Sequence, residues 1–250
     1  MEAPIATLYY TTVLHCDLTL PTPAENLACD EALLAACESG AADSVLRLWE
    51  PTGHFVVLGY ANQAAREANL DFCRWKGIPV LRRCSGGGTV LQGPGCLNYA
   101  LILSSQAGPC GSISSANEFI MRRHQAALAE LLQRPVERRG HTDLAIGGLK
   151  FSGNAQRRHD RWLLFHGSFL LHFDLELIES ALPMPSRQPD YRLGRPHDAF
   201  LMNLEIRAHL LKAALIKAWE ALHPLTKTPL EEVRRLVRDK YTNDAWNLKF

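Results

Sequence analysis

The sequence lacks the features that assign a chain to several common classes. No apolar run approaches the roughly 20 residues needed to cross a bilayer, and residues 1–4 lack the basic start of a signal peptide. The net charge is only +1, so the chain has no basic field of the kind that attracts nucleic acid. We therefore expect a cytoplasmic protein that binds neither membranes nor nucleic acids.

Cysteine pairs and the common ligand-binding loops are also missing. The seven cysteines include no Cys-x-x-Cys pair, which argues against a zinc site or a disulfide framework and favours a reducing compartment. The phosphate-binding G-x-x-x-x-G-K-[ST], the dinucleotide-binding G-x-G-x-x-G and the nucleophile elbow G-x-S-x-G are all absent. With 250 residues, 47% of them hydrophobic, the chain can still bury a full core.

What the sequence does contain is a run of three glycines, Gly86 to Gly88, soon after the cations Arg82 and Arg83. Glycine has no Cβ, so such a loop can bring its backbone amides close to a ligand. Strand-forming residues on both sides predict a hairpin-like connection, and the adjacent arginines should point to opposite faces. One arginine should therefore reach the loop, although an ordinary glycine-rich turn with solvated arginines is the alternative.

A second motif is the predicted β-hairpin over residues 143–158, with a Gly-Gly turn at its centre. Strand alternation places Lys150 on the face opposite its apolar neighbours, with Ser152 and Asn154 close behind. If that face is solvent, Lys150 is a surface lysine. If it faces a pocket, the ammonium can hold a phosphate or a developing carbonyl charge.

A third motif interrupts the long apolar segment 162–173, which we expect to be a central strand. His166 and Gly167 lie in its middle, and a glycine inside a strand often marks a bulge or the close approach of a ligand. A histidine at such a position is either a hydrogen-bonded structural residue or a contact to substrate.

In order and spacing, these segments resemble the superfamily of lipoate–protein ligase A and the octanoyltransferases. The resemblance covers almost the whole chain and implies an α/β (α+β) fold, with a mixed, largely antiparallel sheet flanked by helices, as in the catalytic domain shared with biotin ligases. The segments that carry it are Arg82-Arg83-x-x-Gly86-Gly87-Gly88-x-Val90, Asp143-Leu144, Lys150-x-Ser152-Gly153-Asn154-Ala155 and His166-Gly167-x-x-Leu170-Leu171.

The resemblance implies an enzyme that attaches a lipoyl or octanoyl group to a lysine of a lipoyl-domain acceptor through an acyl-adenylate, with ATP and Mg²⁺. Lys150 would be the catalytic residue, binding the carbonyl and phosphate oxygens of the mixed anhydride. The implied substrate-binding residues are Arg83, Ser85, Gly86, Gly87, Gly88, Gln92, Ser152, Gly153, Asn154, His166 and Gly167.

Two departures from the family pattern affect this reading. Ligases of the family usually carry a histidine where this chain has Gln92, whose neutral amide can still hydrogen-bond a carboxyl or adenylate oxygen. Two-domain ligases also carry an accessory domain after the segment that matches Lys240 to Trp246. We therefore expect residues 1–250 to form one catalytic domain, with adenylation in need of a separate accessory chain or not the reaction at all.

Two alternative functions remain open. An octanoyl- or lipoyltransferase would take its acyl group from an acyl carrier protein or a lipoylated protein, without ATP, through a cysteine thioester. The position that carries the thiol in some subfamilies lies in residues 140–143, which contain no cysteine, so Cys84 and Cys96 beside the glycine loop are the remaining candidate nucleophiles. The second alternative, supported by Gln92, is a non-catalytic protein that binds an acyl group or its carrier.

Capping signals predict where several helices begin and end. Thr22 to Glu25 and Thr228 to Glu231 combine a threonine cap, a proline and a glutamate, and Ser115 with Glu118 forms a capping-box pattern. A further helix is expected from Asn203 to Leu222, with Leu210, Leu211, Leu215 and Trp219 buried. The proline-rich segment Pro183 to His197 is expected to be a surface loop with solvated charges, or alternatively a cover over the acyl slot.

Overall fold

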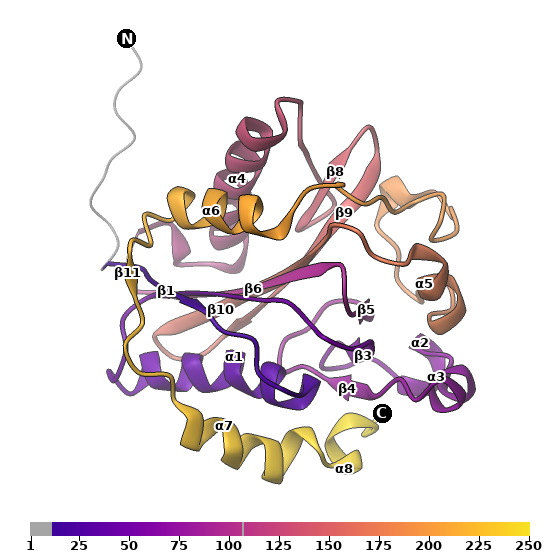
Figure 1. The fold of residues 1–250 in the computed structure, drawn as a ribbon, viewed down its shortest axis with the longest axis horizontal. Helices are drawn as coiled ribbons and strands as arrows, with labels where there is room; N and C mark the ends of the chain where they lie inside the picture. Colours follow the sequence, from indigo (N-terminus) through magenta and orange to yellow (C-terminus); the bar gives the residue numbers. More distant parts are fainter. Residues whose placement is uncertain (1–11, 107) are drawn as a thin grey trace.

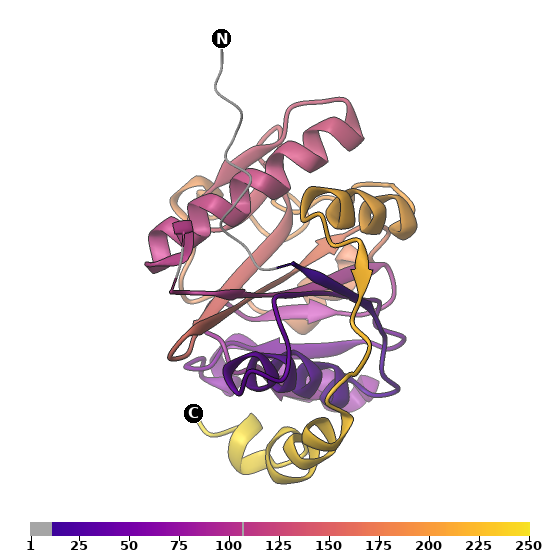
Figure 2. The same ribbon diagram turned by 90° about the vertical axis from the view of Figure 1, so that its left-hand side faces the viewer.

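A computed structural model describes residues 12–106 and 108–250 of the chain. Residues 1–4, whose composition argues against a signal peptide, lie outside the described residues. One large sheet runs through the centre, with helices above and below it, and a small sheet lies beside its lower face (Figures 1 and 2). In the described part of the chain, no helix combines the length and apolar character that crossing a bilayer requires.

The large sheet has eight strands in the order β11-β1-β2-β6-β10-β9-β8-β7, and the small sheet has the order β4-β3-β5. Neighbours in the large sheet are antiparallel from β2 to β7, and β1 is parallel to both β2 and β11. This mixed, largely antiparallel sheet confirms the predicted fold class. The strands are β1 (Leu14–Asp17), β2 (Val45–Trp49), β3 (Phe55–Leu58), β4 (Val80–Arg82), β5 (Val90–Gln92), β6 (Cys96–Ser104), β7 (Glu137–Arg139), β8 (Asp143–Ile146), β9 (Leu149–Arg158), β10 (Trp162–Leu170) and β11 (His223–Pro224).

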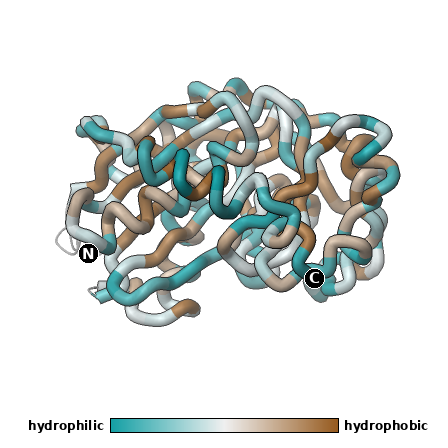
Figure 3. The backbone as a smooth tube through the Cα atoms, turned by 90° about the horizontal axis from the view of Figure 1, so that it is seen from below, coloured by the Kyte–Doolittle hydropathy of each residue, from teal (hydrophilic) through white to brown (hydrophobic). Residues whose placement is uncertain are grey.

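The long helices lie on opposite sides of the large sheet, α4 and α6 above it and α1 and α7 below it in Figure 1. Seen from below, the helices nearest the viewer carry both hydrophilic and hydrophobic residues (Figure 3), and α1, which contacts α7, is buried along most of its length. The helices are α1 (Pro23–Glu38), α2 (Ala64–Glu67), α3 (Leu70–Lys76), η1 (Gly108–Cys110), α4 (Ile113–Leu132), α5 (Leu175–Ala181), η2 (Asp190–Arg192), α6 (Ala208–Ala218), α7 (Leu230–Leu236), η3 (Val237–Tyr241) and α8 (Asp244–Asn247).

Strand β6 shows why the sheet is central, because eight of its nine residues are buried. Its alternate side chains enter two different cores: Tyr99 and Leu101 pack on the side of α4 and α6, and Ala100 and Ile102 pack on the side of α1. The same alternation governs β10, where Phe165 joins the α4 side and the next residue, His166, points the other way. Polar residues of the central strands therefore reach the side of the sheet on which α1 and the small sheet lie.

Four sequence predictions about single elements need correction. Thr228 does not cap a helix, because α7 begins at Leu230 with Pro229 at its N-cap position. The glycine loop does not connect a hairpin, because β4 and β5 do not pair with each other and both pair with β3, which lies between them. Helix α4 is capped by Ser112 with Ser115 as its partner, so the expected capping box starts three residues too late. Helix α6 is shorter than predicted, and Leu210 on it is 38% exposed rather than buried.

Other local predictions are confirmed. Helix α1 begins with the expected capping box of Thr22 and Glu25, and it ends two residues before Gly40. Strands β8 and β9 form the expected hairpin, and both turn glycines have positive φ, as a two-residue turn of this kind requires. Strand β10 lies between β6 and β9, which makes it a central strand as predicted. The sequence thus placed the elements that carry the candidate site.

Candidate active site

One cavity of about 720 Å³ brings together most of the predicted site residues. Its inner end lies among buried residues of α1, β2 and β10, and its mouth lies among half-exposed residues of β8, β9 and the segment Pro183–His197, called the strap below. Ser85 and Gly86 do not line the cavity, and neither do Cys84 and Cys96. The predicted residues that line it are Arg83, Gly87, Gly88, Gln92, Lys150, Ser152, Gly153, Asn154, His166 and Gly167.

The glycine loop is shaped by Arg83 from within. Its guanidinium donates to the carbonyl oxygens of Gly86 at 2.5 Å and Gly88 at 2.8 Å, and to Ser85 Oγ at 3.0 Å. The side chain is buried, which lowers the pKa of Arg83 to about 10 and still leaves it charged at neutral pH. A Cβ on Gly87, whose φ is +87°, would lie 2.8 Å from this guanidinium. The loop therefore needs glycine at this position.

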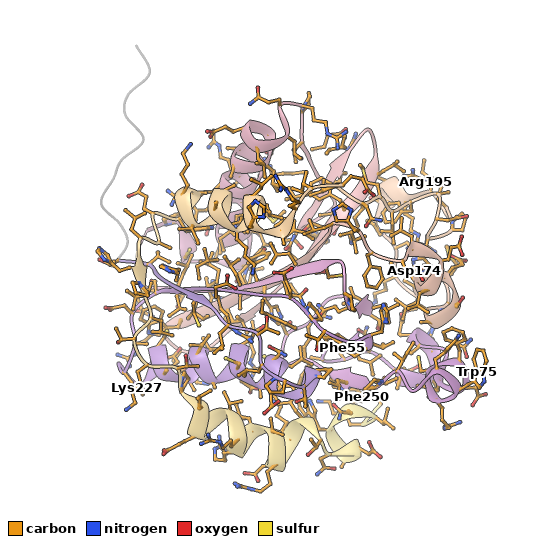
Figure 4. The ribbon with its side chains drawn as sticks, in the orientation of Figure 1. Phe55, Trp75, Asp174, Arg195, Lys227 and Phe250 are labelled. Atoms are coloured by element: carbon orange, nitrogen blue, oxygen red, sulfur yellow. The ribbon has the colours of Figure 1, made fainter. Side chains whose placement is uncertain are left out.

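Arg82 points away from the cavity and ties β4 to the last residues of the chain. Its Nε donates to the carbonyl oxygen of Trp246 at 3.1 Å, its amide donates to Asn247 Oδ1 at 3.0 Å, and its Nη1 donates to the carbonyl oxygen of Gly59 at 2.8 Å. The ring of Phe250 lies 5.3 Å from the guanidinium, and Figure 4 shows Phe250 below the small sheet. The two arginines thus occupy opposite faces, as strand alternation predicts.

A chain of buried hydrogen bonds closes the inner end of the cavity. Asp30 forms a 2.6 Å ion pair with Arg47, and its other oxygen lies 3.2 Å from His166 Nδ1. His166 Nε2 lies 2.5 Å from Ser85 Oγ. Ser85 Oγ accepts from Arg83, and the tautomer of the His166 ring sets which atom donates in the bonds from His166 to Ser85 and Asp30. His166 therefore links the buried Asp30–Arg47 pair to the glycine loop.

Lys150 lies at the opposite end, near the mouth. Its Nζ pairs with Asp143 Oδ1 at 2.8 Å, and the other carboxylate oxygen accepts the hydroxyl hydrogen of Tyr191 at 2.9 Å. A Cβ on Gly153 would lie only 2.8 Å from Nζ, so any larger residue at position 153 would collide with the ammonium in its present position. The Lys150 side chain is 24% exposed, which means that it faces a cavity rather than bulk water.

The strap lies across the mouth of the cavity, and hydrogen bonds to neighbouring elements hold it in place. Ser186 hydrogen-bonds the buried Glu67 on α2, and Arg195, at the upper right of Figure 4, donates to the carbonyl oxygen of Gly148 at 3.1 Å. Arg192 is only 4% exposed, lines the cavity and stacks on Phe200. The expectation of solvated charge is wrong for Arg192, and the alternative of a cover over the cavity fits this segment.

The polar wall between the two ends is held by amide side chains. Tyr99 donates its hydroxyl hydrogen to Asn154 Oδ1 at 2.6 Å, and Asn154 Nδ2 donates to the carbonyl oxygen of Thr142 at 2.6 Å. Gln92 accepts a hydrogen bond from Asn98 Nδ2 at 3.1 Å and is 8% exposed. The neutral amide of Gln92 is therefore part of the cavity wall.

A comparison with known proteins decides what kind of chain this is. The model of the lipoyl protein ligase A/B catalytic domain matches residues 22–206, which include the glycine loop, Lys150 and His166. The chain belongs to this family. The family predicted from the spaced motifs is therefore confirmed.

Relatives of the chain in the lipoyl protein ligase A/B family carry two different names. Lipoate-protein ligase A subunit 1 of Thermoplasma acidophilum is 26% identical, over 92% of this chain and 95% of its own. Octanoyltransferase LipM of Symbiobacterium thermophilum is 29% identical, over 90% and 94%. The bi-partite lipoate protein ligase of T. acidophilum has the same fold, with a TM-score of 0.81 at 23% identity, covering 96% of this chain and 97% of its own.

The candidate nucleophiles have none of the features of a reactive thiol. All seven cysteines are buried, and burial raises the pKa of Cys84 and of Cys96 to about 12. A protonated thiol away from the cavity is a poor nucleophile. In the described residues, no group of three or more His, Cys, Asp or Glu side chains is arranged to hold a metal ion.

Sequence reasoning assigned no role to several residues that line or support the cavity. Asp30 and Arg47 were detectable, because each is a charged residue inside an apolar helix or strand and needs a partner there. The pairing of Asp143 with Tyr191 joins residues 48 positions apart, and no local pattern predicts it. The same holds for the contact between Glu67 and the strap.

Proposed function

We propose that this chain attaches a lipoyl or octanoyl group to a lysine of a lipoyl-domain acceptor through an acyl-adenylate. The observation that carries the proposal is that Lys150 and the glycine loop, more than 60 residues apart in the sequence, line one cavity. Such a cavity is of the size that takes a small ligand, and its two ends differ in chemistry. A cation lies at the mouth, and a buried hydrogen-bond network that includes the Asp30–Arg47 ion pair lies at the inner end.

In this proposal the carboxyl end of the acyl group lies at Lys150 and the chain extends inward past Asn154 and Gly167. Lys150 Nζ donates to the carbonyl oxygen and the phosphate oxygen of the mixed anhydride. An acyl phosphate is already activated, so the protein has mainly to orient it and stabilise the oxyanion. The remaining predicted binding residues stay predictions: Arg83, Ser85, Gly86, Gly87, Gly88, Gln92, Ser152, Gly153 and His166.

ATP and Mg²⁺ enter the proposal as substrate and cofactor. Arg192 and His197 on the strap line the cavity and supply polar groups near the mouth. Asp190, which is exposed there, would supply an oxygen ligand to a magnesium ion that arrives on the phosphates. When bound, the ion would neutralise charge on the phosphates. Few protein ligands are needed, because Mg²⁺ usually keeps several waters and phosphate oxygens.

The acceptor and the possible accessory chain are also part of the proposal. The T. acidophilum ligase is named as bi-partite and is described with its E2 lipoyl domain. We propose a lipoyl-domain acceptor for this chain as well, and a separate accessory chain if residues 1–250 do not adenylate lipoate alone. An acyl carrier protein would replace ATP as the source of the acyl group in the alternative below.

The test uses the purified chain and an apo lipoyl domain, with the mass of the intact acceptor as the readout. One mixture contains lipoate, ATP and Mg²⁺, and the other contains octanoyl carrier protein without ATP. Mass gain in the first mixture alone supports the proposal, and Lys150→Ala should abolish it with the fold intact. No gain in the first mixture, even with an accessory chain added, contradicts it.

Transfer without ATP is the second candidate, and the octanoyltransferase names among the relatives favour it. Gain in the second mixture alone would support it, and a trapped thioester that Cys84→Ser or Cys96→Ser abolishes would identify the nucleophile. Burial of both thiols argues against that step. Tight binding of lipoyl-adenylate without any transfer would instead support the non-catalytic alternative.

A further inference from the structure

We infer that Asp143 is a catalytic residue that binds the ammonium of the acceptor lysine and takes its proton, so that the amine attacks the acyl carbonyl held by Lys150. The inference rests on the proposed function, because it needs an acyl group with its carbonyl at Lys150. It assigns to Asp143 a role beyond pairing with Lys150.

The geometry brings the two required charges side by side. Asp143 Oδ1 lies 2.8 Å from Lys150 Nζ, so an oxygen held by this ammonium lies within a few ångströms of the carboxylate. An acceptor ammonium bound at the carboxylate therefore meets the carbonyl carbon without further movement of the protein. The Asp143 side chain is 13% exposed and lines the cavity near its mouth, where an incoming lysine would arrive.

Tyr191 makes the carboxylate a fixed target. Its hydroxyl donates to Asp143 Oδ2 at 2.9 Å. Burial, and to a lesser degree the negative charge of Asp143, raises the pKa of Tyr191, so the phenol keeps its proton and remains a donor. The other charged or titratable groups close to this pair are Lys150, His141, and two arginines, Arg139 on β7 and Arg195 on the strap.

The other carboxylates on the cavity wall are less well placed to bind and deprotonate the acceptor lysine. Asp30 lies at the inner end and is committed to Arg47 and His166. Glu67 lies on α2, is 5% exposed and accepts from Ser186. Asp190 is exposed to solvent, where an ion pair with a lysine contributes little. In the part of the chain that the structure describes, only Asp143 pairs directly with Lys150.

The step balances as follows. The acceptor lysine enters as an ammonium and gives one proton to the Asp143 carboxylate. The neutral amine then forms a nitrogen–carbon bond to the acyl carbonyl, whose oxygen charge Lys150 stabilises. The carbon–oxygen bond to the phosphate breaks, AMP leaves with its electron pair, and the second nitrogen proton goes with the phosphate. Asp143 finally loses its proton to solvent through the mouth.

The experiment compares two nucleophiles in single turnovers from acyl-adenylate formed on the enzyme. One is the apo lipoyl domain, whose lysine must lose a proton, and the other is hydroxylamine, which is already neutral at pH 7 and forms a hydroxamate. For Asp143→Asn we expect transfer to the lipoyl domain to fall about 100-fold, within the usual range for a lost general base, and hydroxamate formation to stay within about 3-fold. Asp198→Asn, an exposed carboxylate that follows the strap and does not line the cavity, is the matched control.

A pH profile gives a second readout that a merely structural role would not produce. With Asp143→Asn, the rate of transfer to the lipoyl domain should rise about tenfold per pH unit toward the ordinary lysine pKa, because only the neutral amine reacts. Equal losses with both nucleophiles, or an unchanged profile, would overturn the inference and leave the proposed function standing. Absence of hydroxamate from the wild-type chain with lipoate and ATP, even with an accessory chain added, would refute the proposed function itself, and the inference with it.

Discussion

Replacing Gly153 by alanine should separate activity from stability. The added Cβ would lie 2.8 Å from Lys150 Nζ and 2.9 Å from its Cε, whereas ordinary contacts begin at 3.4 Å. The flexible end of the lysine must therefore retreat by about 0.6 Å or more, away from the position in which it pairs with Asp143. Displacement on this scale costs up to about 100-fold in rate, and complete loss of one oxyanion donor costs about 2.7–4 kcal/mol.

The backbone should tolerate the same change. Gly153 lies within β9 and has no positive φ, and alanine in a strand is favoured over glycine by roughly 0.5–1 kcal/mol. We expect the free energy of unfolding, measured with urea, to stay within about 1 kcal/mol of wild type, and acceptor loading, measured by intact mass over time, to fall 30- to 100-fold. Gly53→Ala, at an exposed turn position with no atom within 4 Å of the added Cβ, is the control. Wild-type loading by Gly153→Ala would refute the placement of the reaction at Lys150.

Three further predictions follow from burial and charge. Arg83→Met should lower the free energy of unfolding by about 2–4 kcal/mol in urea titrations, because two loop carbonyls lose their buried donors. This variant should also lose acceptor loading, and a stable variant that still loads the acceptor would contradict the prediction. Cys84→Ala and Cys96→Ala should each keep loading within about 3-fold, since burial raises both thiol pKa values to about 12, whereas loss of loading in either would point to a thioester. Burial lowers the pKa of His124 to about 3, so the unfolded chain binds the extra proton below pH 6.5 and stability should fall by up to about 1.4 kcal/mol per pH unit between pH 6.5 and 3. His124→Gln should flatten that slope in urea titrations at pH 6.5 and 5, and an unchanged slope would show that other groups cause it.

The elements were predictable where one local rule decided the outcome. The cap at Thr22, the turn at Gly147 and the apolar run of β10 each follow from the chemistry of neighbouring residues. The positions of β4 and β5 in the small sheet were not predictable. The two strands do not pair with each other, because β3, from earlier in the chain, lies between them. A glycine loop between two strands looks the same in sequence whether or not those strands pair.

The residues of the candidate site were predictable where they belong to a local motif. Spaced motifs located the glycine loop, Lys150 and His166, and the cavity brings all three together. The partners of these residues were hidden, since Tyr191 meets Asp143 and Asp30 meets His166 only through long-range folding. Arg192 was misjudged because a proline-rich segment rich in charge usually lies in solvent, and here it covers a cavity.

The bonds from Arg82 to Trp246 and Asn247 have a consequence for how the chain is made. They connect residues more than 160 positions apart, so a growing polypeptide carries the glycine loop long before the support beneath it has been synthesised. We expect nascent fragments to leave that loop unbraced on the ribosome, and the cavity to reach its working shape only after residues 246 and 247 have been synthesised.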